Sequence, residues 1–196
     1  MRKLSVNQEV KLLKLLKNCK PIDRGSSRLC FIHPLDKTKV IKLAIGKKAL
    51  CQNKLEALTF KNYGDSLPLA EIYEYGRFIV VMERMKQTFS PETLEDCCCY
   101  GEWDNLPDED TVNETVEQLE SIFGCTADNY QLGYNQDGDL VSYDYGFNPE
   151  KGCFVMCGFA EDIGKRELRP YLDSCVKLLK EKRPVNQIDR LQDRDY

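Results

Sequence analysis

Apolar residues at the start of the chain recur at the spacing of a helix. The pattern begins after Ser5, a side chain that can cap a helix, continues to about Asn18 and stops before Pro21. The residues of the apolar stripe are Val10, Leu12, Leu13, Leu15 and Leu16. The pattern predicts a helix that packs one face against the rest of the protein.

Two pairs of short apolar segments follow, and a polar turn joins the members of each pair. Residues 28–32 and 39–44 form the first pair, and residues 70–75 and 78–83 form the second. Such pairs predict β-hairpins. Residues 47–62, between the pairs, have a helical pattern. The first half of the chain is therefore expected to form an antiparallel sheet with one helix packed against it.

The second half adds further helices and strands after a polar segment that has no clear period. The pattern predicts helices over residues 109–123 and 165–182. Two strands are predicted around residues 130–132 and 140–143, on either side of a turn. The predicted fold class is α+β.

Length and charge restrict the class of protein. A chain of 196 residues normally makes one domain or two small lobes. The net charge of −4 argues against electrostatic binding to the nucleic-acid backbone. No apolar segment approaches the ~20 residues of a membrane span, and residues 1–5 do not resemble the start of a signal peptide. We therefore expect a cytoplasmic protein without a membrane partner.

The ten cysteines are expected to be reduced, mostly buried thiols that pack as small apolar residues. A secreted disulfide framework is the alternative, but it is typical of short chains with a signal peptide. Zinc sites need spaced ligands, whereas Cys97, Cys98 and Cys99 are adjacent, no CxxC pair occurs and His33 is the one histidine. We expect no structural zinc.

Three charged residues suit phosphoryl transfer from ATP. The reaction needs a cation on the phosphates, a carboxylate that holds this cation and a carboxylate for the metal ion. Lys42 lies in the second strand of the first hairpin, Glu56 on the helix that follows, and Asp144 at the end of a strand. These positions predict a Lys42–Glu56 pair and a Mg²⁺ ligand at Asp144. The alternative is that Lys42 and Glu56 are solvated and that Asp144 starts a turn.

Several segments together resemble a protein kinase. Residues 24–31, 40–44 and 53–56 resemble its N-terminal lobe, residues 78–85 its last strand and hinge, and residues 140–146 its metal-binding Asp-Phe-Gly motif. The resemblance implies a compact two-lobed fold with an antiparallel N-lobe sheet and a reduced helical C-lobe. It also implies ATP and Mg²⁺ as cofactors. More narrowly, residues 47–56 and 141–147 are similar to short kinase-like proteins of tailed bacteriophages.

The resemblance assigns roles to further residues. Gly25 stands in the glycine-rich loop, Glu83 at the hinge and Gln131 at the position of the catalytic-loop asparagine. The resemblance therefore implies Gly25, Lys42, Glu56, Glu83 and Gln131 as cofactor-binding residues. Thr126 stands at the position of the catalytic aspartate, and the nearby Asp128 is the candidate for an improvised base.

Departures from the kinase pattern favour a protein that has lost catalysis. Gly25 is the one glycine left in its loop, and His-Arg-Asp is missing. The loss of phosphate-cradling glycines and of a metal ligand acts on electrostatic stabilisation, usually the largest part of catalysis. The resemblance and these departures together imply a phage pseudokinase in the host cytoplasm, which serves mainly as an interaction or regulatory module for a host or phage protein and binds a nucleotide weakly or not at all.

Two alternatives remain open. One is an active small ATP-dependent protein kinase that uses Lys42, Glu56 and Asp144, and the other is a structural domain with a coincidental pattern. The predicted organisation is an N-terminal helix plus N-lobe (residues 1–85), a reduced C-lobe (86–183) and a polar tail (184–196).

Overall fold

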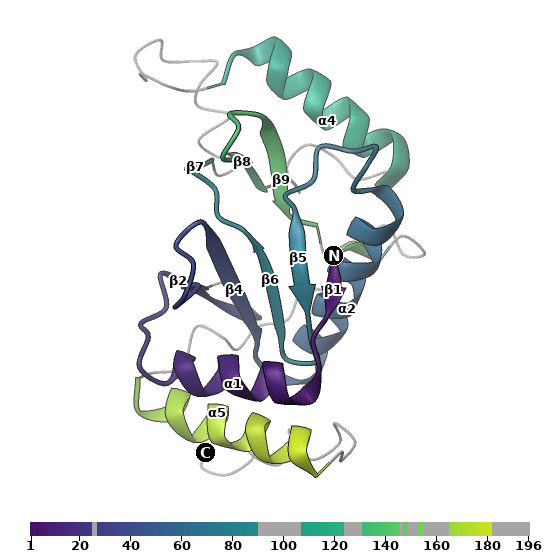
Figure 1. Cartoon of the computed structure of the whole chain (residues 1–196). Coiled ribbons are helices and arrows are strands. Elements are labelled where there is room, and N and C mark those ends of the chain that lie inside the picture. Colours follow the sequence, from purple (N-terminus) through teal and green to yellow (C-terminus); the bar gives the residue numbers. More distant parts are fainter. Residues whose placement is uncertain are drawn as a thin grey trace, which may run out of the picture.

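The computed structural model describes residues 1–24, 27–89, 107–123, 131–145, 147–148, 153–154 and 165–181. These residues form an α+β protein built around a mixed six-stranded sheet and a smaller three-stranded sheet (Figure 1). The strands of the large sheet, in spatial order, are β1 (Arg2–Lys3), β5 (Ile72–Tyr75), β6 (Ile79–Glu83), β4 (Lys39–Ala44), β3 (Arg28–Ile32) and β2 (Asp23–Arg24).

The two predicted hairpins form the centre of the large sheet. β3 pairs antiparallel with β4, β5 pairs antiparallel with β6, and an antiparallel β4–β6 pair joins the hairpins. The prediction of antiparallel pairing is confirmed for these strands. β1 lies parallel to β5 at one edge, so the sheet as a whole is mixed. The sequence pattern did not predict β1, because two residues are too few to show a period.

The first and last described helices lie side by side at one end of the large sheet (Figure 1). α1 (Val6–Leu16) begins at the predicted cap, Ser5, and α5 (Lys165–Lys180) runs along it. Leu13 of α1 and Leu172 of α5 are buried in the same core. α5, which falls within the residues assigned to the reduced C-lobe (86–183), packs against the N-terminal helix.

α2 (Gly46–Tyr63) packs against the large sheet, close to the predicted residues 47–62. No side chain caps its first turn. Instead, the Gly46 N–H donates to the Tyr171 hydroxyl at 3.2 Å, and this hydroxyl donates to the Ala44 carbonyl at 2.7 Å. Since Tyr171 belongs to α5, the last helix fixes the start of α2.

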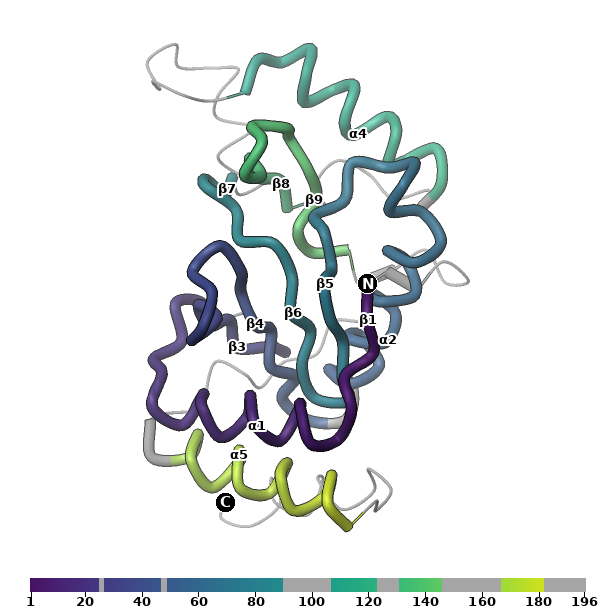
Figure 2. Tube along the Cα trace, in the orientation of Figure 1, coloured from purple at the N-terminus to yellow at the C-terminus, as the bar shows by residue number. Residues whose placement is uncertain are grey.

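The small sheet consists of β7 (Gln87–Phe89), β8 (Gln131–Tyr134) and β9 (Leu140–Asp144), with α4 (Glu109–Phe123) packed beside it (Figure 2). The predictions of β8, β9 and α4 are confirmed. β7 lies in the polar segment for which no strand was predicted. A shorter antiparallel pair joins β10 (Phe147–Asn148) and β11 (Cys153–Phe154).

One apolar core joins the two sheets. Val40 and Val80 of the large sheet belong to the same buried cluster as Leu132 and Val141 of the small sheet and Leu119 of α4. A bridge between Leu69 and Ser142 adds a backbone connection. The ends of β4 and β9 are therefore held at fixed positions relative to each other, which matters for the site that lies between them.

No helix in the described part of the chain is long and apolar enough to cross a membrane. The predicted polar tail (184–196), Trp103 and the run from Cys97 to Cys99 lie outside the described residues.

Candidate functional site

Lys42 extends from the middle of the large sheet towards α2 and β9. In the ladder it lies opposite Cys30 of β3 and Val80 of β6. Its side chain is 9% exposed. The ammonium group donates to Glu56 Oε1 at 2.9 Å and to the carbonyl oxygen of Tyr143. The predicted Lys42–Glu56 pair is therefore present.

Glu56 is the buried carboxylate at the centre of the site, and its side chain has no exposed surface. It lies on the face of α2 that points towards β4. Besides Lys42, it accepts two hydrogen bonds from Arg28, one from Nη1 to Oε2 at 2.5 Å and one from Nη2 to Oε1 at 3.3 Å. Buried ionised groups need such partners, because an unpaired buried charge is strongly unfavourable.

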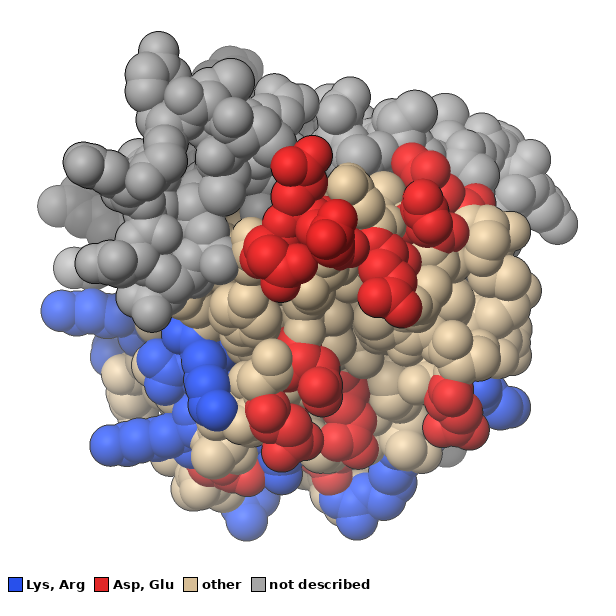
Figure 3. All heavy atoms as spheres, turned by 90° about the horizontal axis from the view of Figure 1, so that it is seen from above, with Lys and Arg blue, Asp and Glu red and all other residues tan. Residues whose placement is uncertain are grey.

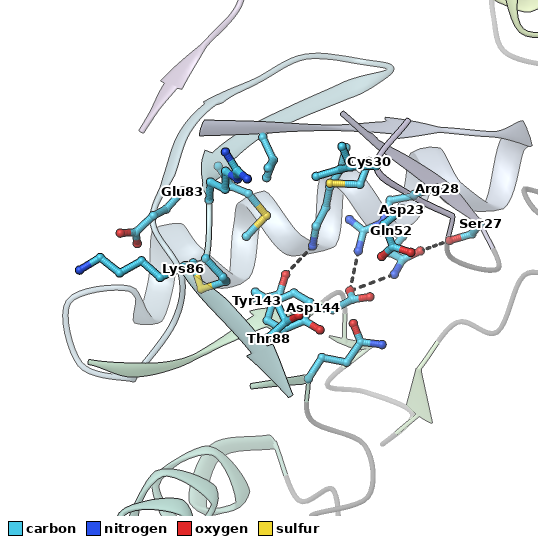
Figure 4. Close-up of a pocket in the computed structure, with 17 residues that line it drawn as sticks. Asp23, Ser27, Arg28, Cys30, Gln52, Glu83, Lys86, Thr88, Tyr143 and Asp144 are labelled. Atoms are coloured by element: carbon cyan, nitrogen blue, oxygen red, sulfur yellow. Dashed lines mark hydrogen bonds and ion pairs between the residues drawn. The ribbon is translucent and has the colours of Figure 1, made fainter. Parts of the chain in front are cut away.

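Asp144 ends β9 and joins the same group of charges. Its Oδ1 accepts from Arg28 Nη2 and, at 3.4 Å, from Gln52 Nε2 (Figure 4). Burial alone would raise the pKa of Asp144, but the charges of Arg28 and Lys42 outweigh it, so the pKa is lowered. Asp144 is thus ionised near neutral pH and is held by a cation of the protein itself.

Arg28 is the residue that the sequence interpretation missed. It begins β3, is 6% exposed and bridges Glu56 and Asp144. Burial alone would lower the pKa of its guanidinium, but Glu56 and Asp144 outweigh this effect and raise it. The four side chains of Arg28, Lys42, Glu56 and Asp144, called here the ion network, carry two positive and two negative charges.

A pocket of about 470 Å³ opens beside the ion network (Figure 4). This volume lies within the ~300–1,000 Å³ of small-molecule sites. Its walls combine apolar side chains, among them Val40 and Met82, with Lys42, Arg28 and Asp144. Cys30 also lines it, and burial raises the pKa of this thiol to about 11, so that it is protonated near neutral pH.

The remaining predicted site residues are more dispersed. Glu83 lines the pocket at the end away from Asp144 (Figure 4), and its Oε1 accepts from the Gln136 N–H at 3.0 Å. Gln131 lines the pocket and lies opposite Asp144 in the β8–β9 ladder. Gly25 and Asp128 lie outside the described residues.

The described side chains do not form a magnesium site by themselves as they are arranged. Mg²⁺ takes six oxygen ligands in near-ideal octahedral geometry. Asp144 Oδ1 and both oxygens of Glu56 already accept from protein cations. Within the described ranges, no group of three or more His, Cys, Asp or Glu side chains could hold a metal ion. A magnesium ion on Asp144 Oδ1 would have to displace Arg28.

The ion network thus combines a buried lysine–carboxylate pair with an arginine that bridges Glu56 and Asp144. Comparison with known proteins assigns no family to this arrangement: no protein-family model matches the chain, and no curated protein matches it.

Proposed function

We propose that this protein is a kinase-like module without phosphoryl-transfer activity, encoded by a phage and acting in the host cytoplasm. The observation that carries the proposal is the contact between Arg28 and Asp144. The carboxylate that would hold Mg²⁺ in a kinase is here neutralised by the protein. Phosphoryl transfer depends on a metal ion that bridges the phosphates, so the arrangement favours binding over catalysis.

The pocket supports a role for a nucleotide in this module. Its volume of about 470 Å³ suits a ligand of that size, and its apolar walls lie next to the donors of Lys42 and Arg28. The nucleotide would then stabilise the joint between the two sheets, because the pocket is lined by β4 and β6 on one side and by Gln131 and Asp144 on the other.

A protein partner, from the host or the phage, is the second part of the proposal. The outer face of α4 carries the exposed side chains of Glu109, Asp110, Glu114 and Glu117. Figure 3 shows acidic side chains gathered on the face seen from above. Together with the net charge of −4, this face would attract a basic protein surface.

An active small kinase is the second candidate function, and the Lys42–Glu56 pair at 2.9 Å favours it. In active kinases the corresponding pair is required for catalysis. The two candidates differ in what Asp144 does: a metal ligand in the active enzyme, and a partner of Arg28 in the non-catalytic module.

Transfer of radiolabelled phosphate from ATP to proteins of a host lysate separates the candidates. The wild-type protein and the Asp144→Asn variant are compared at equal concentration after circular dichroism has shown that both are folded. We expect equal labelling in both samples and in lysate alone. Labelling that needs the wild-type protein and disappears with Asp144→Asn would overturn the proposal and establish the active kinase.

A further inference from the structure

Arg28 lies between the carboxylates of Glu56 and Asp144, and this position bears on whether the pocket can bind a nucleotide together with Mg²⁺. A nucleotide that binds with Mg²⁺ brings its own cation, which needs a carboxylate of the protein. The two carboxylates of the ion network are already held by Arg28 and Lys42. A second cation next to Asp144 would be repelled by the guanidinium, since like charges a few ångströms apart are unfavourable.

Arg28 keeps hydrogen-bonding capacity after its contacts within the protein are satisfied. A guanidinium has five N–H donors, and three hydrogen bonds from Arg28 to Glu56 and Asp144 are present. Lys42 has three donors, of which two are used, on Glu56 and on the Tyr143 carbonyl. Both residues line the pocket, so their remaining donors can serve a ligand that carries acceptor oxygens.

The fixed position of Arg28 suits it for binding a ligand that carries acceptor oxygens. Its guanidinium is held by two carboxylates from different elements, Glu56 on α2 and Asp144 on β9, and is 6% exposed. A cation that is already oriented loses little conformational entropy when a ligand binds. Planar guanidinium groups also match phosphate oxygens in geometry.

We propose that the pocket binds a nucleotide through its phosphate groups without a divalent metal ion, and that Arg28, held by Glu56 and Asp144, donates hydrogen bonds to the phosphate oxygens in place of the metal. This inference rests on the proposed function and adds to it the form of the ligand. Lys42 is the second residue that donates hydrogen bonds to the phosphate groups. A divalent metal ion is then not needed for the nucleotide to bind.

The test measures binding of a fluorescent ADP analogue by anisotropy, in excess EDTA and in excess MgCl₂. We expect saturable binding in EDTA, with a Kd that changes by less than about threefold when Mg²⁺ is added. Binding that weakens by more than about tenfold in EDTA would overturn the inference. Absence of binding in both buffers would also overturn it. The proposal that the protein lacks phosphoryl-transfer activity would not be affected, because transfer is measured in a separate experiment.

Arg28→Gln provides the variant, and Arg169→Gln the matched control. Arg169 is an exposed arginine of α5 whose Nε donates to the Lys17 carbonyl at 3.4 Å. In EDTA we expect Arg28→Gln to weaken binding at least about tenfold, the effect of losing one charge-assisted contact, and Arg169→Gln to have no effect. Unchanged binding by a folded Arg28→Gln variant would contradict the assignment. If this variant does not fold, the two buffers with wild-type protein decide the question.

Discussion

The guanidinium of Arg28 is ion-paired with the carboxylate of Asp144, although the two residues lie 116 positions apart in the sequence. Arg28 begins a strand of the large sheet and Asp144 ends a strand of the small sheet. This ion pair therefore links the two sheets, in addition to the apolar core that the two sheets share.

The pH dependence of stability reports on this contact. The pKa of Asp144 is lowered in the folded protein, from a usual value of 3.8. A lowered pKa adds stability that is fully present above pH 3.8 and is lost as the pH falls towards the folded value. We expect Asp144→Asn to reduce the free energy of unfolding by about 1.5–3 kcal/mol at neutral pH.

Urea denaturation of both proteins over a series of pH values checks this prediction. The difference in the free energy of unfolding between wild type and Asp144→Asn should shrink only below pH 3.8. A difference that grows as the pH falls would show that Asp144 is not stabilised as an anion.

Glu56 is expected to be the most sensitive member of the ion network. Its side chain is fully buried and is paired with both Arg28 and Lys42. Glu56→Gln removes the buried negative charge that Arg28 and Lys42 share. This loss is expected to lower the free energy of unfolding by about 3–5 kcal/mol. Asp173→Asn is the control, because Asp173 is 63% exposed and pairs with Lys17 at the surface, where a pair contributes about 0–1 kcal/mol. Equal effects of the two substitutions in urea would refute the buried role of Glu56.

Gly76 has no space for a side chain. A Cβ at this position would lie 2.4 Å from Cδ of Glu9. Glu9 is itself buried, and its Oε1 accepts from the Phe78 N–H at 2.6 Å. Gly76→Ala should therefore displace Glu9 and lower the free energy of unfolding by about 1–3 kcal/mol.

Gly138→Ala provides a contrast to this steric effect. Nothing lies within 4 Å of a Cβ at Gly138, but its φ is +95°. The cost there is conformational and amounts to about 1–2 kcal/mol. Combining each change with Glu9→Ala separates the steric cause from the conformational one. In the Glu9→Ala background, the loss of unfolding free energy caused by Gly76→Ala should be smaller, whereas the loss caused by Gly138→Ala should be unchanged. If both stay the same, the clash with Glu9 is not the cause.

Tyr171 tests whether α5 controls the start of α2. Removing its hydroxyl in Tyr171→Phe takes the partner from the Gly46 N–H and the Ala44 carbonyl. We expect a loss of about 1–3 kcal/mol and faster amide hydrogen exchange in the first turn of α2. Ser174→Ala, on the exposed side of the same helix, removes a hydrogen bond to the Pro170 carbonyl and should leave exchange in α2 unchanged. Identical exchange in the two variants would argue against the role of Tyr171.

Local patterns sufficed for most elements of the fold. The stripe after Ser5, the two hairpins and the acidic start of α4 each carry a period or a cap that acts over a few residues. β1 and β7 were missed because strands of two and three residues are defined by their neighbours in space and not by their own sequence. The packing of α5 on α1 was missed for the same reason, since chain order does not specify which distant face an amphipathic helix covers.

The site was predicted in part. Lys42 and Glu56 were found because a strand followed by a helix places them near each other. The loop-and-strand pattern around Arg28 does not single it out, although a signal is present: the hairpin register puts Cys30 opposite Lys42, and side chains two residues apart share a face. That it would bridge Glu56 and Asp144 depends on how β9 approaches the large sheet, a long-range feature that no local pattern contains.

The central claim is that Arg28, and not a metal ion, holds Asp144. The most direct measurement is NMR of the Arg28 guanidinium ¹⁵N–¹H groups, assigned with Arg28→Lys, during titration with MgCl₂. If Arg28 holds Asp144, its Nη resonances stay in slow exchange and keep the shifts of an ion-paired guanidinium at saturating MgCl₂. Loss of these resonances on addition of MgCl₂, with matching shifts of the Asp144 amide, would show that a metal displaces Arg28 and would contradict the claim.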